Sequence, residues 1–79
     1  MAKKIIGDVN LSDLYLKQLP EILKDVSIDG HFFCSNNQLT SLVGAPKTVG
    51  GSFDCSDNPV KFTKQQVRAV CDVKGDVYV

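Results

Sequence analysis

Hydrophobic and polar positions alternate in four short segments of the chain, and each segment begins at a glycine. The segments are 7–12, 30–35, 51–56 and 75–79, so their glycines are spaced by 23, 21 and 24 residues. A period of two is typical of a β-strand, whose side chains point to opposite faces in turn. The sequence therefore predicts four strands at a nearly constant spacing.

One face of these expected strands is apolar throughout. Its side chains form the pairs Val9/Leu11, Phe32/Cys34, Phe53/Cys55 and Val77/Val79. Units that recur with such a period stack on one another, because each can bury its apolar face only against its neighbours. We expect two apolar columns inside a stack of strands.

A helical pattern occupies residues 61–74. Thr63 and Gln66 have the spacing of a capping box, in which each side chain bonds the main chain of the other. Apolar residues at helical spacing follow, namely Val67, Val70 and Cys71. A shorter helical turn is expected within 14–23, where Pro20 can begin it.

The phrase Phe-x-Cys-Ser-x-Asn occurs at 32–37 and again at 53–58. Asn37 and Asn58 each stand where the chain must turn after a strand, and an asparagine there can satisfy main-chain groups that the turn leaves unpaired. The pattern apolar-x-apolar-x-x-Asn-x-apolar resembles the leucine-rich repeat. Its short period resembles the bacterial branch of that family.

The resemblance covers about residues 6–60 and recurs at 75–79. It implies an α/β repeat fold, a minimal leucine-rich-repeat-like solenoid with a four-strand parallel sheet and a C-terminal helix on its convex side. The whole chain, 1–79, would be one domain with repeats at about 6–28, 29–49 and 50–73 and a final strand at 75–79. Two departures are Leu14, which replaces the turn asparagine of the first repeat, and the segment 61–74.

The resemblance also implies a non-catalytic protein-binding module. The tracts Leu-Thr-Ser-Leu-x-Gly-Ala-Pro and Gly-Gly-x-Phe-x-Cys-Ser resemble those of small bacterial and bacteriophage proteins. A phage or bacterial factor that binds or inhibits a host protein would fit this resemblance. The identity of the partner does not follow from it.

The polar face of the strands is the expected binding surface, because stacked repeats present such a face as an extended concave surface. Phe33 and Tyr78 stand out there as aromatic side chains on an otherwise polar sheet, and aromatic residues are enriched at interface centres. A single exposed apolar residue is also common without any function. The candidate partner-binding residues are Phe33, His31, Asp54, Asn10 and Tyr78.

Asp8, His31 and Ser52 fall on neighbouring strands and are the residue types of a hydrolytic triad. A triad also needs a pocket and an oxyanion hole, which a flat sheet face does not offer. We expect no catalytic residues, and we expect His31 to be a surface residue that is hydrogen-bonded to Asp8.

The last strand would lie at the edge of the sheet, where unpaired main-chain groups invite pairing with another chain. Val77, Tyr78 and Val79 are therefore candidates for self-association. In this alternative the chain is a self-assembling structural protein, a homodimer with an antiparallel seam.

Nine basic and nine acidic residues cancel, so the chain lacks the positive charge that binds phosphate backbones, and we expect no nucleic-acid partner. We interpret Lys3-Lys4 and the group Lys61, Lys64 and Arg68 as solvated surface. No apolar run approaches the roughly 20 residues of a membrane span, and 1–6 does not resemble a signal peptide.

Three cysteines, an odd number without a Cys-x-x-Cys motif, favour a reducing cytoplasm over a disulfide scaffold. Cys34 and Cys55 should be inward neighbours on adjacent strands. They are expected to be buried thiols rather than metal ligands, because two further ligands are missing. No cofactor is expected.

Overall fold

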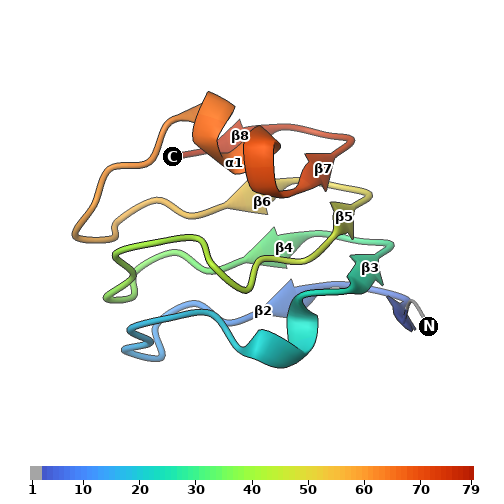
Figure 1. The fold of residues 1–79 in the computed structure, drawn as a ribbon, viewed down its shortest axis with the longest axis horizontal. Coiled ribbons are helices and arrows are strands. Elements are labelled where there is room, and N and C mark those ends of the chain that lie inside the picture. The colour runs from blue at the N-terminus through green and yellow to red at the C-terminus, as the bar shows by residue number, and fades with distance from the viewer. Residues whose placement is uncertain (1–2) are drawn as a thin grey trace.

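Eight short strands form two parallel sheets in the computed structural model, which describes residues 3–79 (Figure 1). The first sheet has the order β1-β3-β5-β7 and the second the order β2-β4-β6-β8. The strands are β1 (Lys3–Ile5), β2 (Val9–Asn10), β3 (Val26–Ile28), β4 (Phe32–Phe33), β5 (Thr48–Val49), β6 (Phe53–Asp54), β7 (Asp72–Val73) and β8 (Val77–Tyr78). The chain alternates between the sheets, so each passage adds one strand to both.

The β2-β4-β6-β8 sheet is the one that the alternating segments predict. Val9 lies opposite Phe32, Phe32 opposite Phe53, and Phe53 opposite Val77, all in parallel pairs. The strands are shorter than the predicted segments, with two residues each. The expected register of the apolar columns is confirmed.

The β1-β3-β5-β7 sheet corrects the expectation of a single four-strand sheet. Its strands precede the four glycines instead of following them. Each strand carries an apolar residue two positions before its glycine. These residues are Ile5, Ile28, Val49 and Val73, and they pair directly across the sheet. The last three are buried, so the second sheet also contributes side chains to the core.

The C-terminal helix is shorter than predicted. It is α1 (Lys64–Val70), and both hydrogen bonds of the Thr63–Gln66 capping box are present. Cys71 is already extended, and the chain continues directly into β7 instead of helix. Val67 is buried in the core, whereas Val70 is 49% exposed and does not belong to the buried stripe.

The expected helical turn in the first half of the chain is the 3-10 helix η1 (Glu21–Leu23), which follows Pro20. Its only buried residue is Leu23. Between the two helices, residues 43–47 contain a turn at 43–44 and no helix.

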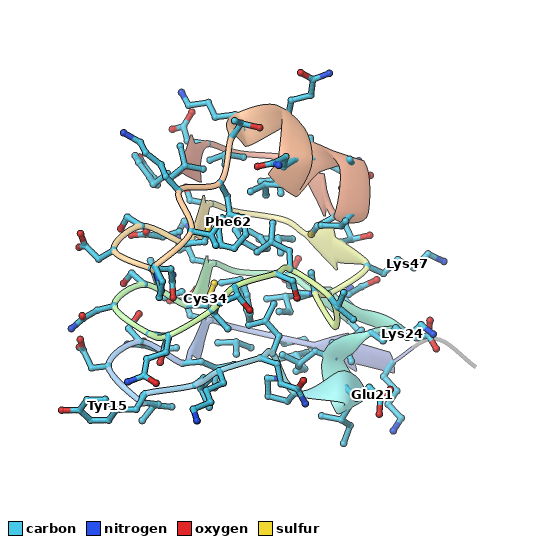
Figure 2. The ribbon with its side chains drawn as sticks, turned by 60° about the vertical axis from the view of Figure 1, so that its left-hand side comes forward. Tyr15, Glu21, Lys24, Cys34, Lys47 and Phe62 are labelled. Atoms are coloured by element: carbon cyan, nitrogen blue, oxygen red, sulfur yellow. The ribbon has the colours of Figure 1, made fainter. Side chains whose placement is uncertain are left out.

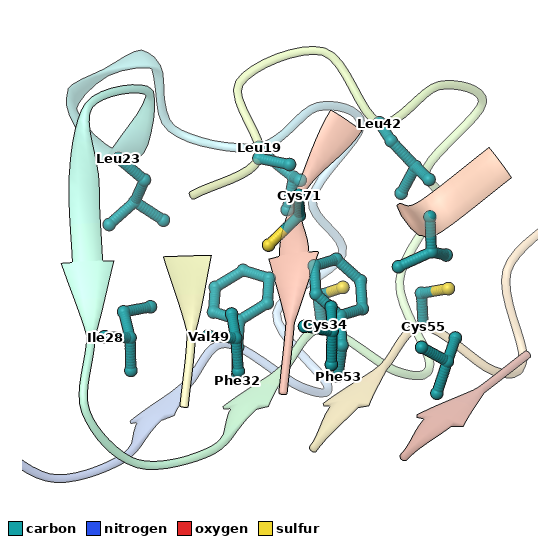
Figure 3. Close-up of a cluster of buried hydrophobic side chains, with 14 of the residues drawn as sticks. Leu19, Leu23, Ile28, Phe32, Cys34, Leu42, Val49, Phe53, Cys55 and Cys71 are labelled. Atoms are coloured by element: carbon teal, nitrogen blue, oxygen red, sulfur yellow. The ribbon is translucent and has the colours of Figure 1, made fainter. Parts of the chain in front are cut away.

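The core lies between the two sheets (Figure 3). Phe32 and Phe53 are fully buried, and their ring centroids are 5.0 Å apart at an interplanar angle of 53°. Cys34 and Cys55 are buried beside these rings. A tilted aromatic pair contributes about 0.5–1.5 kcal/mol beyond its burial, which is substantial for so small a core.

Main chains approach closely where each passage of the chain begins, and glycine permits this approach. A Cβ at Gly50 would stand 2.6 Å from the carbonyl oxygen of Asp29, closer than such atoms ever lie. We expect Gly50→Ala to lower the free energy of unfolding by about 2 kcal/mol, as overpacking does.

Urea unfolding followed by far-ultraviolet circular dichroism measures this loss. Gly7→Ala is the matched comparison, because Gly7 has a φ of 106° but nothing within 4 Å of a Cβ. It should cost about 1 kcal/mol for conformation alone. An equal or smaller loss for Gly50→Ala would contradict the close approach.

Candidate binding face

The polar face of the β2-β4-β6-β8 sheet, called here the outer face, carries two rows of side chains. The register pairs Asn10 with Phe33, Phe33 with Asp54, and Asp54 with Tyr78, so the second row is continuous. The first row lies two positions earlier along the chain, directly before each strand, and contains Asp8, His31, Ser52 and Asp76. All five sequence-predicted binding residues therefore lie on one face.

Phe33 lies in the middle of this face and is half-buried, which modifies the expectation of a ring aimed at solvent. The His31 ring covers part of it, with ring centroids 5.8 Å apart and an interplanar angle of 35°. Tyr78, at the end of the same row, is 52% exposed. The two aromatic side chains thus flank Asp54 within the row.

Side chains of the first row hold the main chain of the next strand. Asp8 Oδ1 accepts a hydrogen bond of 2.8 Å from the main-chain N–H of His31. His31 Nδ1 in turn accepts one of 2.8 Å from the main-chain N–H of Ser52. Because these bonds use main-chain N–H groups, the Asp8, His31 and Ser52 side chains are not linked as in a triad. The expected Asp8–His31 bond is present, but it reaches the His31 main chain.

Two polar side chains of the second row are also fixed. Asp54 Oδ1 accepts hydrogen bonds from Ser56 N at 3.0 Å and from Ser56 Oγ at 2.7 Å. Asn10 Oδ1 accepts one of 3.0 Å from Ser12 N. These are local turns of the Asx type, which order a side chain through its own neighbours. The Asn10 and Asp54 side chains are therefore held in place by the chain itself.

Asn37 and Asn58 hold the turns behind the face, as the sequence predicts. Asn37 Oδ1 accepts from the N–H groups of Leu14 and Leu16, and its Nδ2 donates to three carbonyl oxygens. Asn58 Nδ2 likewise donates to three carbonyl oxygens, and its Oδ1 accepts from Leu39 N. The turn that has Leu14 in place of an asparagine is thus held by Asn37 from the next passage of the chain.

The three thiols are buried and free. Burial raises the pKa of Cys55 to about 11, and the Asp54 carboxylate adds to the rise. Burial raises the pKa of Cys71 to about 12, with a smaller effect from Asp72. Burial, the Cys55 thiol and Asp54 raise the pKa of Cys34 still further. Within residues 3–79 no group of three or more His, Cys, Asp or Glu side chains is placed to hold a metal ion.

Arg68 is exposed, as expected from the sequence, but it also has a structural role that the sequence did not show. Its Nη1 donates to Val73 O at 2.8 Å and its Nη2 to Gly75 O at 3.0 Å. The equivalent carbonyl oxygens one passage earlier belong to Val49 and Gly51. They accept hydrogen bonds from the N–H groups of Lys74 and Gly75. Arg68 therefore takes the place of a further strand at the β7 edge.

The β8 edge is only partly closed. Phe53 N and Cys55 N donate to carbonyl oxygens of β8 and its flank, so by alternation the N–H groups of Val77 and Val79 point away from β6. Val77 is buried and Val79 half-buried, which leaves Tyr78 as the exposed side chain of the three predicted self-association residues.

Among residues 3–79 no helix is long and apolar enough to cross a membrane. No protein-family model, curated protein or solved structure matches the chain.

Proposed function

We propose that this chain is a short leucine-rich-repeat-like solenoid that binds a protein partner through its outer face and carries out no catalysis. The recurring parallel strands and the asparagines that hold their turns support the solenoid. In this proposal α1 lies on the convex side and the outer face is the concave side.

The continuous row Asn10–Phe33–Asp54–Tyr78 is the observation that carries the binding proposal. Two aromatic side chains lie in one row, and their polar neighbours are already hydrogen-bonded to the protein's own main chain. A pre-ordered surface loses little conformational entropy on binding. Aromatic side chains in such a setting are the usual energetic centres of an interface.

The charge of the outer face indicates the chemistry of the partner. Its eight positions include three aspartates and no lysine or arginine. They are Asp8, Asn10, His31, Phe33, Ser52, Asp54, Asp76 and Tyr78. Complementary charge favours specificity and fast association. The partner surface should therefore present an apolar side chain for Phe33 with lysine or arginine around it.

The resemblance to small bacterial and bacteriophage proteins supports a more specific role for the same face. A cytoplasmic factor of this size can bind or inhibit a host protein by covering one of its surfaces. Such a role needs only the outer face and no cofactor.

Phe33→Asp tests this proposal. It should remove the apolar centre and weaken partner binding at least about 30-fold, because a central aromatic anchor contributes about 2 kcal/mol or more. The tagged wild-type chain is used to retain partners from bacterial lysate, and the retained protein is then titrated calorimetrically with each variant.

Tyr15→Asp is the matched control, because it makes the same change at an aromatic residue that is 79% exposed and lies off the outer face. It should bind as the wild type does. Circular dichroism verifies that both variants are folded. Retention of full affinity by folded Phe33→Asp would refute binding through this face.

Self-assembly through Val77, Tyr78 and Val79 is the second candidate. The outward N–H groups of Val77 and Val79 favour it, since they could pair with another edge strand. Arg68, however, occupies the carbonyl groups of the neighbouring β7 edge, so only one of the two sheets could continue there.

A further inference from the structure

The end of the stack that contains β1, β2 and η1 is called here the N-terminal end, and among residues 3–79 it is the less completely covered one. Val9 and Leu11 belong to the apolar columns but are only half-buried, whereas Phe32 and Cys34 beside them are fully buried. Four of the exposed large apolar side chains also belong to this first passage of the chain, namely Ile6, Leu14, Tyr15 and Ile22. Figure 2 shows Tyr15 and Glu21 at this end and Cys34 inside the stack.

No strand among residues 3–79 pairs with the outward edge of β2 at this end. Val9 N and Leu11 N donate to the carbonyl oxygens of His31 and Phe33, so these residues face β4. By alternation the main-chain groups of Asp8 and Asn10 point away from the stack. An edge of this kind is a template for another strand.

The opposite end is more completely covered, although the N–H groups of Val77 and Val79 at the β8 edge still point outward. The helix α1 lies beside β8 at that end (Figure 1) and buries Val67 completely. Arg68 bonds the outward carbonyl oxygens of the β7 edge. Two copies of the chain can therefore approach each other more closely through their N-terminal ends than through their C-terminal ends, which α1 and Arg68 cover.

The sequence of β2 and its flanks is complementary to itself when two copies run antiparallel with Asn10 opposite Asn10. In that register Val9 lies opposite Leu11, and Asp8 lies opposite Ser12. Apolar residues thus meet apolar residues, and no like charges stand directly opposite, which would be destabilising. Between residues 3 and 28 four lysines balance four acidic residues, so the two ends also meet without net repulsion.

The β1 edge differs, because Lys3 and Lys4 are exposed on it and would lie close to the lysines of a second β1. Lysines on an edge strand oppose pairing. Of the two edges at the N-terminal end, only β2 is therefore self-complementary.

We propose that two copies of this chain associate through their N-terminal ends, with β2 paired antiparallel to β2 about a two-fold axis at Asn10. The half-buried Val9 and Leu11 are covered in this dimer, and the outer faces of both copies join into one sheet. The inference goes beyond the proposed function and does not depend on it, since no foreign partner is involved.

Cysteine cross-linking tests the seam directly. In a hydrogen-bonded antiparallel pair the Cα atoms are about 5.5 Å apart, within the range of about 4.4–6.8 Å that a disulfide spans. Asn10→Cys should therefore form a covalent dimer within minutes of mild oxidation. The three native thiols are buried, so oxidation of the wild type measures how much cross-linking occurs without the added cysteine.

Tyr78→Cys is the matched control, because Tyr78 occupies the same row on the other edge strand. It should stay uncross-linked, and light scattering of the wild type at tens of micromolar should give twice the chain mass of 8.6 kDa. Cross-linking of Tyr78→Cys but not of Asn10→Cys would overturn the proposal in favour of a C-terminal seam. A wild-type mass of one chain, without cross-linking of either variant, would show that no such dimer forms.

Discussion

Replacing Asn37 by alanine should leave the chain largely unfolded at room temperature. The amide of Asn37 is 7% exposed and makes five hydrogen bonds to main-chain groups in two passages of the chain. Alanine makes none of them, and each buried group without a partner costs about 1–3 kcal/mol. A domain of this size has only a few kcal/mol of stability in total, so the loss of two or three such bonds is sufficient.

Asn37→Asp sharpens the test. Aspartate keeps the oxygen that accepts from Leu14 N and Leu16 N, but a carboxylate oxygen would then face the three carbonyl oxygens that Nδ2 now bonds. It should unfold the chain at pH 7 as alanine does. Recovery of stability as the pH falls below about 4, where a carboxyl group is protonated and can donate once, would identify the missing donor.

Asn36→Gly is the control at the neighbouring position. Asn36 is exposed and has a φ of 53°, a conformation that glycine adopts without strain. It should change the free energy of unfolding by less than about 1 kcal/mol. The stability of the Asn37 and Asn36 variants is measured by urea unfolding. Circular dichroism is the readout, since the chain has no tryptophan whose fluorescence could be followed. If Asn37→Ala were as stable as Asn36→Gly, the asparagine bonds would not hold the turns.

The parts of the fold that follow from local rules were predictable from the sequence. The register of β2, β4, β6 and β8 follows from alternation, because a shift by one residue would turn Phe32 and Phe53 to solvent. The start of α1 follows from the Thr63–Gln66 spacing, since that capping box needs only residues close in sequence. The turn asparagines were predictable because few side chains can both donate and accept at a buried turn.

The second sheet was not predicted, because its four strands share only one apolar position, which is too few to show an alternation. β5 and β7 have two residues each, and only one of the two is buried in either strand. A signal did exist, in the apolar residue that stands two positions before each glycine. It becomes visible only when the four passages are aligned on their glycines, since Ile28, Val49 and Val73 pair across strands that are distant in sequence.

The candidate face was predictable as a set of residues but not in its chemistry. Alternation placed His31, Phe33 and Tyr78 on one side of the sheet. It could not show that His31 Nδ1 bonds a main-chain N–H or that Phe33 is half-buried beside the His31 ring. The role of Arg68 was equally hidden, because it depends on the distance between a helix and the edge of a sheet.

Alkaline pH should unfold the protein between about pH 9 and 11 through its buried thiols. In the unfolded chain each thiol ionises near the ordinary value of 9.0, whereas the folded-state pKa is about 11 for Cys55 and about 12 for Cys71. Above pH 9 the unfolded state therefore binds fewer protons than the folded state, and stability falls as pH rises. This stability is fully present below pH 9. Each thiol contributes a slope of about 1.4 kcal/mol per pH unit until the folded form ionises as well.

Three such thiols together remove about 4 kcal/mol per pH unit, which is comparable to the whole stability of a small domain. The urea midpoint should therefore be constant from pH 7 to 8.5 and fall steeply above 9. Cys34→Ala should be less stable at pH 7, because it leaves a small cavity in the core, yet its slope above pH 9 should be shallower by about a third. The wild type and Cys34→Ala have the same exposed tyrosines and lysines, so the contribution of these residues cancels when the two slopes are compared. Equal slopes for the two chains would mean that the Cys34 thiol does not carry its share of the alkaline transition.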